Sequence, residues 1–178
     1  DITWIALPGT FDPPSFAHID LLLDSLVRAS EENGSDTAAY AAFLSPLGDR
    51  APSPDGSSWK PVKTDAQSRY EMTRIMSGIF WPLVQSSDLG LKYPADYGTL
   101  NAIRLLDGIP VLEHRKVSFI LTFGEDTFET WRHNVRGIVN APKAAYPGVA
   151  FDLYMFPEHF DFRYTDEETD FEVVTGKY

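Results

Sequence analysis

The sequence predicts an α/β fold, with an open parallel β-sheet that carries helices on both faces. Short apolar runs recur along the chain, and each is bounded by glycine, proline or polar residues, as buried strands are. Between these runs, apolar residues recur at the spacing of a helix. Strands that alternate with helices form parallel sheets, because each connection has to cross back over the sheet before the next strand begins.

The first predicted unit is a strand, a tight turn and a helix. Residues 2–7 (ITWIAL) are a continuous apolar run that predicts a buried parallel strand, and Pro8-Gly9 ends it. A helix is predicted from residue 19 to the stop signal at residues 32–34 (ENG). The apolar residues at helical spacing are Ile19, Leu22, Leu23, Leu26 and Val27. An opening unit of this kind is typical of a Rossmann-like sheet.

A second strand, a long loop and a second helix follow. Residues 38–44 (AAYAAFL) predict a strand, although their alanines fit a helix as well. Residues 45–58 are rich in Pro, Gly, Ser and Asp and predict a surface loop. Residues 67–83 predict a helix. Its apolar residues on or near one stripe are Tyr70, Ile75, Ile79 and Phe80.

The remaining elements complete the alternation. Residues 99–106 predict a short helix that stops at Gly108. Residues 117–123 (VSFILTF) give the strongest strand signal in the chain, and residues 150–156 (AFDLYMF) predict the last clear strand. We therefore expect one α/β domain over residues 1–160, followed by an acidic tail over residues 161–178 that is exposed or poorly ordered.

Composition limits the partners. A formal net charge of -11 argues against nucleic acid, because a phosphate backbone rewards a basic surface. No stretch approaches the roughly 18 to 20 uncharged apolar residues that a membrane span needs, so we expect a soluble protein with no membrane partner. Because the chain starts at Asp1 rather than methionine, a processed or trimmed product is expected. The cytoplasm, an organelle matrix or the nucleus is favoured over secretion.

Cysteine and histidine usage limits the chemistry. The chain has no cysteine, which excludes disulfides, thiolate metal sites and a cysteine nucleophile. No two histidines have a ligand spacing such as HExxH, so a metal ion held by the protein alone is not expected.

The stretch at residues 8–18 (PGTFDPPSFAH) joins the first strand to the first helix. Ligands bind open parallel sheets at the carboxyl ends of the strands. His18 falls in the first helical turn, where unpaired backbone N–H groups and the helix dipole favour anions. Gly9 permits a sharp bend or a close approach to a ligand, and Pro13-Pro14 stiffen the turn. The junction predicts a phosphate site, with a chance strand-turn-helix and a capping histidine as the alternative.

The same stretch resembles a known signature. GTFDPPSFAH resembles GxFDPxTxGH or GxFDPxHxGH, the signature of the nucleotidyltransferase superfamily, whose members transfer a nucleoside monophosphate from a nucleoside triphosphate. The matching residues are Gly9, Phe11, Asp12, Pro13 and His18. Ser15 stands where the signature has Thr or His, and it keeps a hydroxyl that can bond a phosphate oxygen. Ala17 stands where the signature has Gly.

Three later segments resemble the mononucleotide adenylyltransferases of this superfamily. WKPVKTDAQSRYEM resembles the segment beside the two substrates and includes Lys60 and Lys63, although a solvated helix face would carry the same charges. DYGTLNAIRLL resembles the segment that opens a helix with tyrosine and threonine, here Thr99. VSFILTFGEDTFETW resembles a strand followed by Gly-x-Asp and a tryptophan, so Asp126 is a candidate ribose ligand, with helix capping as the alternative. Trp131 either stacks on a pyridine ring or fills the core.

The resemblance implies transfer of the adenylyl group of ATP to nicotinamide or nicotinate mononucleotide, with release of pyrophosphate. Mg²⁺, held mainly by the triphosphate, is the implied cofactor, with no metal ligands assigned to the protein. The implied catalytic residues are His18, Ser15 and Lys60. The implied ATP-binding residues are Gly9, Thr10, Phe11, His18, Gly124 and Asp126. The implied substrate-binding residues are Lys63, Arg69, Thr99 and Trp131.

Other functions stay open. The superfamily usually carries a serine-rich ISSTxxR motif near the end of the domain, and nothing in this chain matches it. A catalytically silent member that acts as a scaffold or as a subunit of a larger assembly is therefore an alternative. Activity like that of phosphopantetheine adenylyltransferase or a cytidylyltransferase is a further one, because the opening motif is shared across the superfamily. A homo-oligomer is compatible with either.

Overall fold

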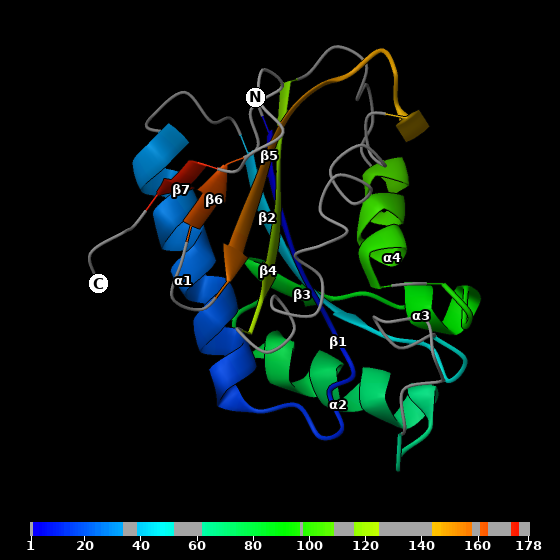
Figure 1. Ribbon diagram of the computed structural model, residues 1–178. Coiled ribbons are helices and arrows are strands. Elements are labelled where there is room, and N and C mark those ends of the chain that lie inside the picture. The colour runs from blue at the N-terminus through cyan, green and yellow to red at the C-terminus, as the bar shows by residue number, and fades with distance from the viewer. Residues whose placement is uncertain are drawn as a thin grey trace.

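A central β-sheet organises the computed structural model, which describes residues 2–33, 39–51, 62–96, 98–108, 116–124, 144–157, 161–163 and 172–174 (Figure 1). The sheet has seven strands in the order β3-β2-β1-β4-β5-β6-β7. The strands are β1 (Ile2–Gly9), β2 (Ala39–Pro46), β3 (Val84–Ser86), β4 (Lys116–Phe123), β5 (Ala150–Pro157), β6 (Asp161–Arg163) and β7 (Glu172–Val174). The pairings from β3 through β5 are all parallel, which confirms the predicted parallel α/β sheet.

Helices cover both faces of the sheet, as predicted. They are α1 (Phe16–Asn33), α2 (Ala66–Gly78), α3 (Leu89–Lys92), α4 (Gly98–Arg104) and the 3₁₀-helix η2 (Leu105–Gly108). In Figure 1, α1 and α4 lie on opposite sides of the sheet. α2 shares the face of α1, because its Thr73 hydroxyl lies 2.6 Å from that of Ser86, and Ser86 is in register with Leu44 and Leu7 on the α1 face.

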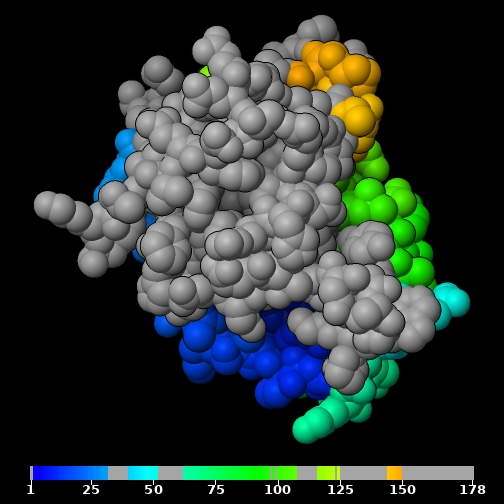
Figure 2. All heavy atoms as spheres, viewed as in Figure 1, coloured from blue at the N-terminus to red at the C-terminus, as the bar shows by residue number. Residues whose placement is uncertain are grey.

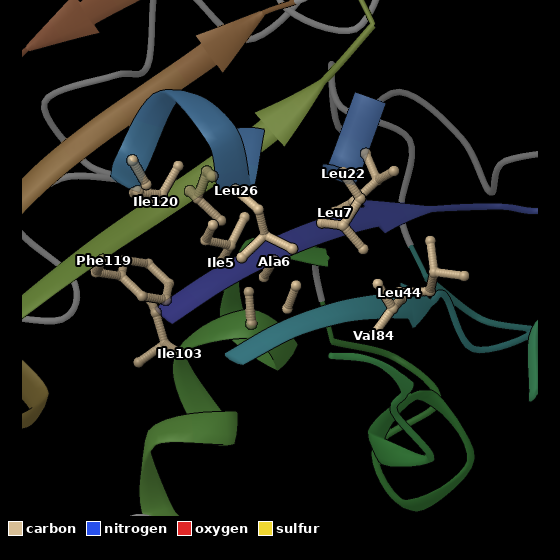
Figure 3. Close-up of a cluster of buried hydrophobic side chains, with 14 of the residues drawn as sticks. Ile5, Ala6, Leu7, Leu22, Leu26, Leu44, Val84, Ile103, Phe119 and Ile120 are labelled. Carbon is tan, nitrogen blue, oxygen red and sulfur yellow. The ribbon is translucent and has the colours of Figure 1, made fainter. Parts of the chain in front are cut away.

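The hydrophobic core lies on both faces of the central strands. Ile5 and Ile120 are register partners, so their side chains point to the same face, where Leu26 of α1 lies near them and Leu22 lies beside Leu7 (Figure 3). Phe119 points to the other face, where it lies beside Ile103 of α4 (Figure 3). Burial on both faces explains why the central strands are continuous apolar runs rather than alternating ones.

The structure corrects the prediction for α2. The helix ends at Gly78 and not at residue 83, and turns occupy residues 79–83. The expected apolar stripe does not face the core, because Ile75 and Ile79 are 70% and 69% exposed. The buried residues of α2 are instead Ala66, Arg69, Thr73 and Ser77. This face packs where loops leave the sheet, and its polar side chains bond the backbone groups and hydroxyls found there.

Two further differences lie after residue 104. The predicted helix 99–106 is α4 up to Arg104 and then narrows into η2, which reaches the predicted stop at Gly108. β6 and β7 were not predicted and fall in the segment that the sequence assigned to the tail; they extend the sheet by antiparallel pairing. Strands of three residues are too short to show an alternating pattern.

Candidate functional site

The candidate site lies at the point where the direction of the chain across the sheet reverses. From β1 the chain proceeds to β2 and β3 on one side, and it later returns to β4 and β5 on the other side of β1. In open α/β sheets, the crevice at such a switch point, beyond the carboxyl ends of the strands, is the usual ligand site. β1 ends at Gly9 and β4 ends one residue before Gly124, so both glycines lie at this edge.

His18 and Ser15 form the polar centre of the junction between β1 and α1. Nδ1 of His18 accepts a hydrogen bond from the backbone N–H of Ser15 at 2.9 Å and lies 3.0 Å from the Ser15 hydroxyl. A backbone N–H can only donate, so Nδ1 carries no proton and the neutral ring is protonated at Nε2. Burial lowers the pKa of His18 below its usual value, which favours this neutral form. The ring therefore has one N–H donor, at Nε2.

The amino terminus of α1 completes an anion site around this pair. α1 is 18 residues long. The N–H of His18 donates to the Ser15 carbonyl at 3.1 Å, whereas the N–H groups of Phe16 and Ala17, which begin the helix, have no partner within the helix. Those groups and the helix dipole attract negative charge. Phe16 is 63% exposed, so the first turn of α1 reaches solvent. In Figure 2, blue atoms from the early part of the chain lie at the surface along the lower edge. This arrangement can bind a phosphate group.

Phe11 and Gly9 support His18 from the core side. The Phe11 ring is buried and meets the His18 ring edge-on, with centroids 4.9 Å apart. A Cβ added to Gly9 would lie 3.0 Å from Cζ of Phe11, so the absence of a side chain at Gly9 lets the ring pack over the backbone. The sequence predicted that both residues bind ATP; in the structure their contacts also position the histidine.

Asp12 joins the opening loop to the segment that precedes α2. One of its carboxylate oxygens accepts hydrogen bonds from the backbone N–H groups of Lys63 and Thr64, at 2.6 and 3.1 Å. The Thr64 side chain, and then these backbone groups, hold the pKa of Asp12 below its usual value. The Asp12–Pro13 peptide bond is cis. Lys63 is thereby brought to the opening loop, and its side chain is exposed.

Arg69, which the sequence predicted to bind substrate, has its guanidinium bonded to protein groups. Its side chain is fully buried, and Nε donates to the carbonyl of Thr64 at 2.9 Å. Nη1 donates to the carbonyls of Thr10 and Leu47, and Nη2 donates to the carboxylate of Asp49. The structure thus occupies this guanidinium with protein groups. Sequence reasoning missed Leu47, Asp49 and Thr64 as its partners, and no local pattern in the chain marks them.

The two departures from the signature fall at exposed positions. Ser15 is exposed and keeps its hydroxyl beside His18. Ala17 is exposed and helical, and the one positive φ of a non-glycine residue in the described chain belongs to Phe11. The backbone at residue 17 therefore does not require glycine.

The remaining predicted site residues are described only in part. Thr10 lies between Gly9 and Phe11, with its carbonyl bonded to Arg69 and its hydroxyl buried without a hydrogen-bond partner among the described residues. Thr99 lies in the first turn of α4, but its side chain is outside the described part of the structure. Lys60, Asp126 and Trp131 also lie outside the described residues.

The described residues contain neither a cluster of metal ligands nor a helix that could span a membrane. No group of three or more His, Cys, Asp and Glu side chains within them is placed to hold a metal ion. None of the helices in those segments is both long enough and apolar enough to cross a membrane.

No protein-family model matches the chain, and no curated protein matches it significantly.

Proposed function

We propose that this protein transfers the adenylyl group of ATP to a mononucleotide, nicotinamide or nicotinate mononucleotide, and releases pyrophosphate. One observation supports the proposal above all. The stretch that resembles the nucleotidyltransferase signature lies at the switch point of a parallel sheet, and it sets His18 and Ser15 at the amino end of α1. A signature match that occurs by chance has no reason to fall at this position in the fold.

The proposed chemistry needs no covalent intermediate with the protein. A phosphate oxygen of the mononucleotide attacks the α-phosphorus of ATP in line, the bond from that phosphorus to the bridging oxygen breaks, and pyrophosphate leaves with the electron pair. Catalysis of such a transfer comes mostly from positioning and from stabilisation of charge. The Nε2–H of His18, the Ser15 hydroxyl and the first N–H groups of α1 donate to phosphate oxygens. Lys63, exposed beside the loop, and Lys60 add positive charge.

Mg²⁺ belongs to this proposal as a companion of the triphosphate. When bound, it neutralises charge on the leaving pyrophosphate. One oxygen of Asp12, a carboxylate of the opening loop, already accepts two backbone N–H groups. The N–H groups at the amino end of α1 are donors only, so they suit phosphate oxygens and not a cation. We therefore assign the ion to the oxygens of the triphosphate.

The test is calorimetric titration with ATP and Mg²⁺, followed by addition of nicotinamide or nicotinate mononucleotide and an assay for pyrophosphate. Saturable ATP binding followed by pyrophosphate release is the expected result. His18→Ala should reduce turnover by about a hundredfold or more, because one preorganised donor to the reacting phosphates is lost. A folded His18→Ala variant that turns over at the normal rate would refute the role of His18.

A matched pair of serine variants tests the role of the Ser15 hydroxyl. Ser15 and Ser30 are both exposed serines of the α1 region, and the Ser30 hydroxyl bonds the carbonyl of Val27 near the far end of the helix. Ser15→Ala should weaken ATP binding or turnover, whereas Ser30→Ala should leave both unchanged. Equal effects of the two substitutions would show that Ser15 has no special role.

The silent scaffold is the second candidate, and the two departures at Ser15 and Ala17 with the missing ISSTxxR motif favour it. The same titration separates it from the enzyme, because a folded chain that binds no ATP supports the scaffold. If ATP binds but no pyrophosphate is released, other acceptors such as phosphopantetheine are added next, and CTP is tried as the donor.

A further inference from the structure

Three loops at the carboxyl edge of the sheet converge on the buried side chain of Arg69. They are the turn after β1, represented by Thr10, the turn after β2, represented by Leu47 and Asp49, and the residues before α2, represented by Thr64. The four hydrogen bonds have lengths of 2.7 to 3.0 Å. A guanidinium has five N–H donors in a planar fork, which suits it to several acceptors at once.

The bond to Thr10 bears on the conformation of the next residue. Phe11 has a φ of 52°, a left-handed conformation that a side chain disfavours. Such a conformation persists where the surroundings fix it. Here both neighbours are held, since Arg69 bonds the Thr10 carbonyl and the Asp12 carboxylate accepts from Lys63 and Thr64. The bond from the Leu47 N–H to the Gly9 carbonyl, 2.9 Å long, holds the same turn from the other side.

A continuous chain of contacts leads from Arg69 to the phosphate site. Arg69 bonds Thr10, whose neighbour Phe11 places its ring against His18, and His18 bonds Ser15. We propose that Arg69 is a positioning residue that fixes the Gly9–Ser15 loop for phosphate binding, and that it does not contact substrate. The inference rests on the proposed function for its catalytic consequence, while its structural consequence can be measured without catalysis.

The chemistry of the partners makes arginine specific at this position. Three of the four bonds go to backbone carbonyls on different loops, and only Asp49, 48% exposed, supplies a charge. A lysine ammonium would keep the charge but is a compact group that cannot spread over three loops. Arg69→Lys therefore removes the positioning while it keeps the charge.

The experiment compares Arg69→Lys with Arg74→Lys. Arg74 lies on the same helix and also bonds a carboxylate, that of Glu71, but it is 61% exposed. Two quantities are measured in each variant: the turnover number with the KM for ATP, and amide hydrogen exchange along the chain. Arg69→Lys should lower turnover by about a hundredfold, the scale expected when a reacting group is misplaced by about 1 Å. Arg74→Lys should change neither quantity.

The exchange pattern separates positioning from general stability. In Arg69→Lys, exchange should accelerate in residues 10–18 and 47–49 and stay unchanged in the first half of β1 and in β4. Methylguanidinium added to Arg69→Ala should restore slow exchange in the same residues. Uniform acceleration along the chain, or no acceleration in residues 10–18, would overturn the proposal.

Two further outcomes have to be covered: an Arg69→Lys variant that does not fold, and a wild-type protein that is inactive. If Arg69→Lys does not fold, Asp49→Ala removes one of the four bonds at a half-exposed position, and it should accelerate exchange in residues 10–18 to a smaller degree. Unchanged exchange in that variant overturns the proposal. If the wild-type protein releases no pyrophosphate, the proposed function fails, and the exchange pattern still decides whether Arg69 fixes the loop.

Discussion

Substitution of Gly9 by alanine tests how tightly the site is built. A Cβ at residue 9 would lie 3.0, 3.2 and 3.4 Å from three atoms of the Phe11 ring. The ring is buried and cannot swing into solvent, so it has to shift by a few tenths of an ångström and press on His18. Overpacking of this kind costs about 1 to 3 kcal/mol. Loss of glycine from the unfolded chain offsets about 0.4 to 1 kcal/mol of that cost.

The expected net effect is a loss of up to about 2.6 kcal/mol, with a central value of about 1.3 kcal/mol, in the free energy of unfolding, measured by urea denaturation. Gly78→Ala is the matched control, because a Cβ there meets nothing within 4 Å and the residue ends helix α2. It should be neutral or should stabilise the protein by up to about 1 kcal/mol. If Gly9→Ala is as stable as Gly78→Ala, the packing of Phe11 over Gly9 does not restrain the loop.

Two other predictions concern the titration of His18 and the burial of Asn101. Burial lowers the pKa of folded His18 below the unfolded value of about 6.5, so the unfolded state binds more protons in the window below that value. The stability that neutral His18 contributes is therefore complete above about pH 6.5 and is lost as the pH falls through the folded pKa. The drop in unfolding free energy from about pH 7.5 to about pH 5.5 should be smaller in His18→Asn than in the wild type, and an equal drop would contradict the assignment. Asn101, on the buried face of α4, has neither its amide nitrogen nor its oxygen hydrogen-bonded within the described structure. Because an unsatisfied buried polar group costs about 1 to 3 kcal/mol, Asn101→Leu should be neutral or stabilising in thermal denaturation. A strong loss of stability would mean that an ordered water molecule or a ligand group satisfies the amide.

The elements that could be predicted from sequence are those whose signal is local. The apolar runs that became β1 and β4 are buried on both faces, so every residue in them carries the signal. The helical spacing of Leu22 and Leu26 places them on the core face of α1 in the same way. In α2 the same reasoning failed, because its inner face meets the edge strand β3 and the loops at the end of the sheet rather than the apolar centre of the sheet. Arg69 and Thr73 occupy buried positions there.

In the opening stretch, too, some contacts could be predicted from the local sequence and others could not. Gly9, Phe11 and Asp12 match the signature, and each makes contacts within the loop or with a segment far away in the sequence. A sequence pattern reveals that these residues occur together, but it cannot reveal that Asp12 bonds Lys63 and Thr64, about 50 residues away. Gly9 and Phe11, which the sequence predicted to bind ATP, are thus also residues that hold the loop.

The residues that match the signature and the residues that depart from it occupy different environments in the loop. The matching residues Gly9, Phe11 and Asp12 make the internal contacts that fix the loop, and His18 is held by them. The departures, Ser15 and Ala17, are exposed. A substitution at Ala17 alters what the loop offers to a ligand, whereas one at Ser15 also changes the hydroxyl that lies 3.0 Å from Nδ1 of His18. The contacts of Gly9, Phe11 and Asp12 do not involve either departure, so we expect the departures to act on the strength and selectivity of binding. That is the reason why titration with ATP, and not a measurement of folding, discriminates between a transferase and a silent scaffold.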